Sequence, residues 1–103
     1  MSKNQTNVPK LNKNIFPYDF YLAYWIDTTS KSEWENLETA KFYKPSVCVT
    51  TGWLISTKNN SHTFVSDIGF DETNQIINEC GSATTIPTPN IIKLVKIKEI
   101  IND

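Results

Sequence analysis

The feature that most constrains this chain is a series of short segments with period-two patterning between residues 46 and 97. In the longest of them, residues 46–57 (SVCVTTGWLIST), β-branched side chains alternate between the two faces of an extended strand. Three shorter runs share the signature: 62–68, 82–86 and 91–97. Turn-forming residues at 58–61 separate the first run from the second, and turn-forming residues at 87–90 separate the third run from the fourth. The pattern predicts four short strands in one antiparallel sheet.

Three details of this region shape the expected sheet. Gly52 lies in the middle of the first strand and predicts a bulge or a sharp bend. Residues 69–81 are polar and acidic, which predicts a longer loop with a helical turn near 74–77. Residues 91–101 are compatible with two predictions, a last strand or a helix that begins at Thr88-Pro89. The strand is favoured because the apolar residues there form no single helical stripe.

A further strand precedes this region. Residues 18–26 (YDFYLAYWI) are rich in aromatic and β-branched side chains. The even positions from Tyr18 to Ile26 are all apolar or aromatic, so we expect them to face the core. The odd positions from Asp19 to Asp27 are mixed, and we expect that face to meet a neighbouring element or a partner.

Between the first strand and the strand at 46–57, the sequence predicts a short helix over residues 33–42. Ser32 and Glu35 have the spacing of a capping box, and Trp34 and Leu37 keep helical spacing. Pro45 ends the helix. Residues 1–14 are expected to be a polar flexible tail, and residues 15–103 a single small β-barrel domain.

The expected fold class is mainly β with one short helix. A strongly bent antiparallel sheet of this length is expected to close as a small barrel of the SH3-like or Sm-like kind. The segment from Thr85 to Leu94 resembles the closing hairpin of the Sm-like family, and Gly52-Trp53-Leu54 is similar to that family's Gly-x-Leu. The uridine-pocket motif of Sm proteins has no counterpart in residues 58–63.

The chain also resembles short uncharacterised phage and prophage proteins. The similarity rests on Trp25-Ile26-Asp27, on residues 48–54 and on the Ile86-Pro87 corner. The resemblance implies a phage-encoded or prophage-encoded binding module located in the cytoplasm of a bacterial host. Small barrels also have strand edges that pair readily, so a homo-oligomer is expected.

Composition narrows the partners and the compartment. The chain has ten lysines, no arginine and a net charge of −1. This composition disfavours nucleic acid as a partner, and it disfavours sequence-specific DNA binding most strongly. No apolar run reaches membrane-spanning length, so we expect no contact with a membrane. The N-terminal residues lack an apolar leader, so we expect a cytoplasmic location. In a reducing compartment Cys48 and Cys80 need not pair, although a disulfide stays open.

Few residues suggest chemistry. His62 is the only histidine, and we predict no catalytic residue, no metal site, no cofactor and no enzymatic activity. The candidate binding residues are Tyr21, Trp25, Asp27, Trp53, Lys93, Lys96 and Lys98.

Two hypotheses use these residues. The first is a homo-oligomeric module that binds a protein or a small ligand through Tyr21, Trp25 and nearby polar groups. The alternative is an Sm-like protein that binds single-stranded nucleic acid (RNA), with Trp25 stacking on bases and a strip formed by the three lysines.

Overall fold

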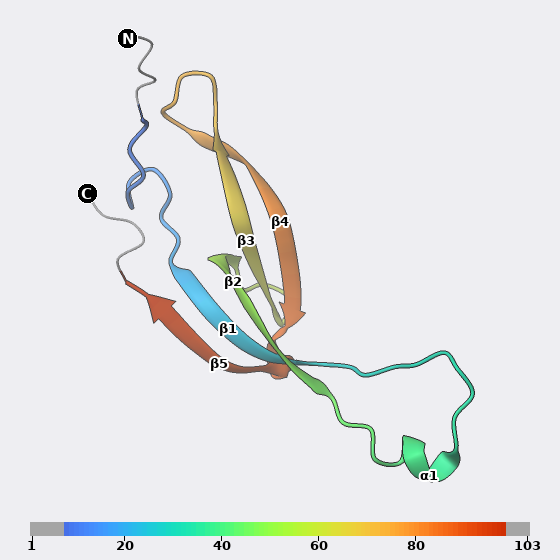
Figure 1. Cartoon of the computed structure of the whole chain (residues 1–103). Helices are drawn as coiled ribbons and strands as arrows, with labels where there is room; N and C mark the ends of the chain where they lie inside the picture. The colour runs from blue at the N-terminus through green and yellow to red at the C-terminus, as the bar shows by residue number, and fades with distance from the viewer. Residues whose placement is uncertain (1–7, 99–103) are drawn as a thin grey trace.

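The computed structural model describes residues 8–98. One sheet dominates the structure (Figure 1). Its elements, in chain order, are β1 (Phe20–Asp27), α1 (Leu37–Ala40), β2 (Ser46–Ser56), β3 (Ser61–Phe70), β4 (Ile77–Pro87), the 3₁₀ turn η1 (Thr88–Asn90) and β5 (Ile91–Ile97). The mainly β class with one short helix is confirmed, and so is the strand predicted at 91–97.

The five strands form an antiparallel sheet in the order β4-β3-β2-β1-β5. The edge strands β4 and β5 are joined by the three residues of η1, so the two edges meet at that corner. Away from the corner they diverge, as Figure 1 shows. The sheet is therefore strongly bent, as expected, but it is not closed into a barrel, because β4 and β5 do not pair.

The hairpins explain how the strands are placed. Asn59 and Asn60 both have positive φ, at 57° and 55°, which is the geometry of a tight two-residue turn between β2 and β3. The predicted loop over 69–81 is wrong in most of its length, since β3 and β4 continue to Phe70 and from Ile77. The turn between them is organised by Asp71, whose Oδ1 accepts from the Thr73 hydroxyl at 2.8 Å.

The expected bulge at Gly52 is also wrong in position. Pairing with β1 runs without a break through Gly52, and the irregularity against β3 falls between Leu54 and Ser56. Glycine is needed at position 52 for another reason. A Cβ there would lie 2.7 Å from the carbonyl oxygen of Val65, so the β3 backbone approaches too closely for any side chain.

The core lies on the odd-numbered face of β1, which was expected to meet a neighbouring element or a partner, and it meets neighbouring strands. Ala23 is fully buried in a cluster with Phe64 and Ile86, and Tyr21 and Trp25 pack against the cluster. The expectation that the even positions face the core is therefore wrong. Both rows of β1 are apolar enough for burial, and the bend of the sheet, which wraps around the odd row, decides between them.

The even row lies on the opposite, outer face. Phe16 covers one end of that face, where its ring meets the edge of Trp53 at a centroid distance of 5.6 Å. At the other end, cross-strand pairs place Tyr24 beside Val49 and Ile26 beside Val47. We call these four residues the outer patch. Val47 and Val49 are 64% and 50% exposed, so nothing in the described part of the chain covers this end.

The connection between β1 and β2, residues 28–45, projects beyond the sheet and carries α1 (Figure 1). We call it the arm. The predicted helix over 33–42 is wrong in extent, since α1 has four residues and its N-cap is Asn36 instead of Ser32. With the arm extended, the chain measures 65 × 30 × 23 Å and has a radius of gyration of 19.1 Å. A compact domain of this length would have about 13 Å.

Candidate functional site

Tyr21, Trp25 and Asp27 share one face of β1, as the sequence predicts, but that face is the core face. Trp25 is half-buried, and its indole N–H donates to Thr50 Oγ1 at 2.9 Å. Tyr21 packs against the same core cluster. Asp27 ends the strand in an exposed position, where its carboxylate accepts from the Thr28 amide. Tyr21 and Trp25 are therefore partly buried against the core cluster.

Trp53 lies on the other face. Its ring meets Phe20 edge-on at 5.0 Å and Phe16 at 5.6 Å, so it belongs to the small aromatic cluster under the N-terminal segment. The indole N–H of Trp53 is buried and has no hydrogen-bond partner in the described residues. Its packing shows a structural role.

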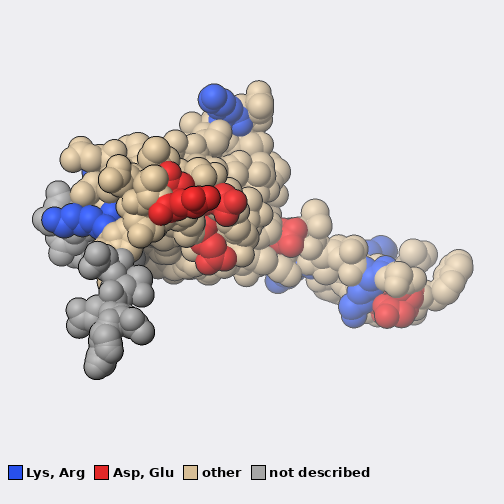
Figure 2. Space-filling model, turned by 90° about the horizontal axis from the view of Figure 1, so that it is seen from above, with Lys and Arg blue, Asp and Glu red and all other residues tan. Residues whose placement is uncertain are grey.

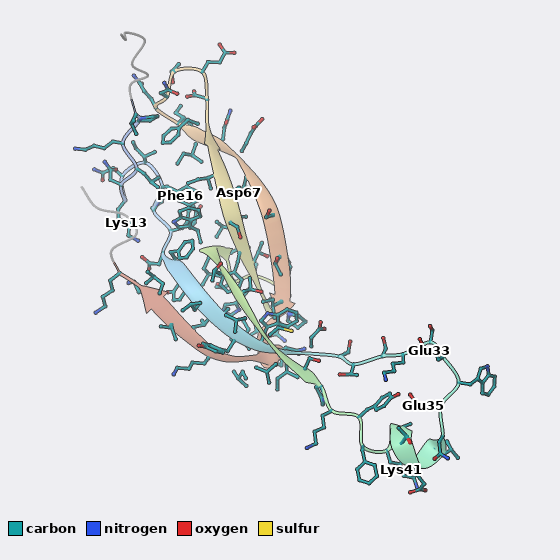
Figure 3. The ribbon with its side chains drawn as sticks, viewed as in Figure 1. Lys13, Phe16, Glu33, Glu35, Lys41 and Asp67 are labelled. Carbon is teal, nitrogen blue, oxygen red and sulfur yellow. The ribbon has the colours of Figure 1, made fainter. Side chains whose placement is uncertain are left out.

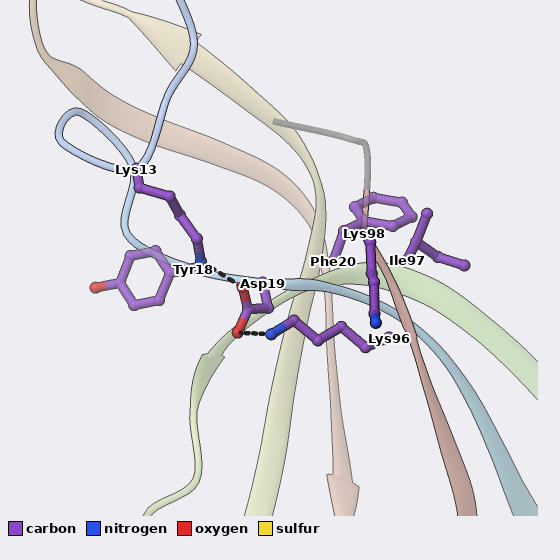
Figure 4. A pocket seen from close by; sticks show the side chains of 7 residues that line it. All are labelled: Lys13, Tyr18, Asp19, Phe20, Lys96, Ile97 and Lys98. Carbon is purple, nitrogen blue, oxygen red and sulfur yellow. Dashed lines mark hydrogen bonds and ion pairs between the residues drawn. The ribbon is translucent and has the colours of Figure 1, made fainter. Parts of the chain in front are cut away.

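The three candidate lysines do not form one strip. Lys93 pairs with Tyr24 and Lys96 with Tyr21, so the two side chains leave the sheet on opposite faces. Lys96 and Lys98 instead line a pocket of about 210 Å³ beside the start of β1 (Figure 4). The remaining lining residues are Lys13, Tyr18, Asp19, Phe20 and Ile97.

Asp19 dominates the electrostatics of this pocket. It forms ion pairs with Lys13 and with Lys96, the latter at 3.4 Å (Figure 4). The hydrogen bond from Lys13 lowers the pKa of Asp19, and contact with Lys96 lowers it further against an opposing effect of burial. The Asp19 carboxylate is thus paired with two of the three lysine ammonium groups that line the pocket. The residues that line the pocket include no histidine, cysteine or serine.

The groups with the greatest chemical reactivity lie apart. His62 Nδ1 is 2.8 Å from Thr88 Oγ1, and its ring stacks on Phe64 at 6.3 Å. Cys48 is a half-buried free thiol, and Cys80 is an exposed one. Within residues 8–98, no three His, Cys, Asp or Glu side chains are grouped as metal ligands.

The most unusual surface is on the arm. Trp34 is 101% exposed, Leu37 79% and Phe42 78%, and none of them packs on the sheet. Large exposed apolar side chains on one segment are uncommon on the surface of a protein that acts alone. Among the aromatic side chains that the structure describes as exposed, those of Trp34 and Phe42 are the most open to solvent.

Inside the arm the contacts are polar. The Thr29 hydroxyl donates to the Lys44 carbonyl at 2.5 Å and joins the two sides of the arm at its base. The Tyr43 hydroxyl donates to Glu35, and Lys31 lies 5.4 Å from the centre of the Tyr43 ring. Figure 3 shows Glu33, Glu35 and Lys41 on this segment, well away from the sheet. Polar groups therefore hold the arm together, and apolar groups face outward.

The arm carries no net charge. It contains three lysines and three glutamates. Figure 2 shows basic and acidic side chains next to one another at its end, and Lys41 pairs with Glu38 at 2.9 Å. A neutral surface with exposed aromatic groups offers little attraction to a polyanion.

Sequence reasoning did not include Trp34, Leu37 and Phe42 among the candidate binding residues. Their spacing resembles that of a helix with one buried face, which is the commoner meaning of such a pattern. One signal was available. The polar residues between them and the short length of the segment leave little apolar surface with which to bind the rest of the chain.

Comparisons with known proteins add no assignment. No family model matches the chain, and no curated protein or solved structure shows significant similarity to it. No helix within residues 8–98 combines the length and apolar character needed to cross a membrane.

Proposed function

We propose that this chain is a non-enzymatic protein-binding module that works as a homo-oligomer, with the arm as its contact element. The observation that carries the proposal is the inverted polarity of the arm. Its polar groups bind one another, whereas Trp34, Leu37 and Phe42 point away from the sheet. Exposing these side chains to water is unfavourable by about 25 cal/mol per Å² of apolar surface, and a protein partner would remove that cost.

The absence of grouped reactive side chains in residues 8–98 supports a binding role over a catalytic one. His62 lies against a threonine and a phenylalanine, and neither free thiol is among its contacts. We propose that the bent sheet is an open relative of SH3-like barrels. The strand order and the three-residue 3₁₀ connection between the edge strands support that assignment. An origin in a phage or prophage, and a cytoplasmic location, remain proposals that rest on the sequence resemblance and composition.

Light scattering on a size-exclusion column tests the binding role. The wild-type chain is expected to elute with a mass above the 11.8 kDa of one copy at micromolar concentration. The double substitution Trp34→Ser and Phe42→Ser should return it to one copy, while Lys58→Ser in the β2–β3 turn should leave the mass unchanged. A wild-type chain that stays at 11.8 kDa up to millimolar concentration contradicts the proposal.

Fluorescence polarisation with labelled oligouridine tests the competing ligand. The separation of Lys93 from Lys96 and the neutral arm predict no binding at 150 mM salt. Tight binding that weakens steeply as salt rises would favour single-stranded nucleic acid instead.

A further inference from the structure

The structure contains a second apolar surface that is only partly covered, with Val47 and Val49 at least half exposed. The outer patch, formed by Tyr24, Ile26, Val47 and Val49, lies on the outer face of β1 and β2 at the end nearest the arm. All four side chains stand on the same face, because directly paired residues of antiparallel strands share a face. The four side chains are uncharged, and Lys93, which pairs with Tyr24 on the same face, stands at the border of the patch on β5.

The arm cannot cover this patch within its own chain. The Thr29 to Lys44 hydrogen bond closes its base, and the segment then leads away from the sheet (Figure 1). Trp34 remains fully exposed as a result. Each copy therefore carries one apolar projection and one apolar receptor surface, and the two do not meet in a single copy.

We infer that the partner of the arm is a second copy of this chain, in which Trp34, Leu37 and Phe42 dock on the outer patch. The inference rests on the proposed function and names the binding surface. A two-fold arrangement satisfies both surfaces at once, since each copy gives its arm and receives the other. The neutral charge of the arm sets no electrostatic barrier to this pairing.

The exposed area supports the same partner. The chain exposes 7827 Å², whereas a compact monomer of its mass exposes about 5,900 Å². A standard interface needs only about 800 Å² from each partner. Part of the excess lies on the arm, where Trp34, Leu37 and Phe42 are each at least 78% exposed. Val47 and Val49 of the outer patch add to it, since each is at least 50% exposed.

Photochemical cross-linking tests the docking site. A benzophenone amino acid replaces Trp34, and the labelled chain is mixed with ¹⁵N-labelled wild type so that contacts between copies are recognised by mass. Irradiation is expected to join position 34 to residues 24–26 or 47–49 of the other copy. The same amino acid in place of Thr57, in the β2–β3 turn, should give no such product.

A receptor variant provides the second measurement. Val49→Asp changes an exposed strand residue, so the fold should persist by circular dichroism while the dissociation constant for self-association rises at least about tenfold. Phe42→Ser should have an effect of similar size.

The outcomes separate the two proposals. Cross-links to a second copy outside the outer patch, or a Val49→Asp variant that associates like wild type, would overturn the docking site while arm-dependent association still stood. Association unaffected by both Trp34→Ser and Phe42→Ser would remove the proposed function as well.

Discussion

The bent sheet and the arm obey opposite rules of burial. In the sheet, apolar side chains turn inward, and Ala23, Phe64 and Ile86 lie almost wholly out of contact with water. In the arm, every large apolar side chain of the set Trp34, Leu37 and Phe42 faces outward. The chain thus has a core that is buried within one copy and a segment whose apolar side chains are not buried within one copy. The difference is the basis of the proposal that the arm contacts another molecule.

A matched pair of truncations gives the largest expected effect. Phe64→Ala deletes a ring that is 1% exposed, and the free energy of unfolding should fall by about 3–5 kcal/mol. Phe42→Ala deletes the same atoms from the arm, where the change in a dilute single copy should stay within about 0.5 kcal/mol. Urea unfolding followed by circular dichroism measures both. Equal losses in the two variants would break the distinction between sheet and arm.

Added volume in the sheet should have a smaller effect. In Gly52→Ala the new methyl group meets the Val65 backbone at 2.7 Å, so the β2–β3 contact must open at a cost of about 1–3 kcal/mol. Gly69→Ala is the control, because its methyl group would lie 3.7 Å from the nearest atom, in ordinary contact. Thermal unfolding should rank Gly52→Ala well below Gly69→Ala. The reverse order would show that β2 and β3 are not packed as closely as described.

The ion pairs are expected to give the smallest difference in stability between the sheet and the arm. Lys13 and Lys96 hold the pKa of Asp19 below its ordinary value of 3.8, so the folded state favours the ionised carboxylate. Its contribution to stability is therefore complete above that value and is lost as pH falls through the lowered pKa. Asp19→Asn should cost less than about 1 kcal/mol at pH 7, and the difference from wild type should vanish near pH 2.

The arm supplies the control for that measurement. Glu38 and Lys41 form an ion pair whose side chains are both well exposed, so Glu38→Gln should leave the unfolding of a single copy unchanged. Unfolding in 1 M salt should reduce the Asp19→Asn effect by screening. An Asp19→Asn effect that grows at low pH would contradict the assigned ion pairs.

The strands could be predicted because their signals are local. Alternation in residues 46–57 and the turn composition at 58–61 specify a hairpin without knowledge of distant residues. The faces of β1 could not be predicted, since both rows are apolar and only the partners across the sheet show which row is enclosed. The second half of β4 was predicted as the strand at 82–86, but its first part, residues 77–81, was predicted as loop because an exposed edge strand needs few apolar side chains.

The candidate site was harder to foresee than the fold. Tyr21 and Trp25 were correctly placed on one face, but rings inside a small core and rings on a binding surface have the same sequence pattern. Trp34 was expected in a short helix because it keeps helical spacing with Leu37, but spacing does not show whether anything packs against the side chain. That information exists only in the assembled chain.

The most direct measurement follows the exposure of the three tryptophans as the protein is concentrated. The chain is labelled with 5-fluorotryptophan, the Trp34 resonance is assigned from a Trp34→Phe sample, and the H₂O/D₂O isotope shift reports contact with water. The Trp34 shift should be that of an exposed indole in dilute solution and should fall on concentration, while the half-buried Trp25 and Trp53 stay unchanged. A Trp34 resonance that keeps its full solvent shift at every concentration would contradict the claim that a second copy covers the arm.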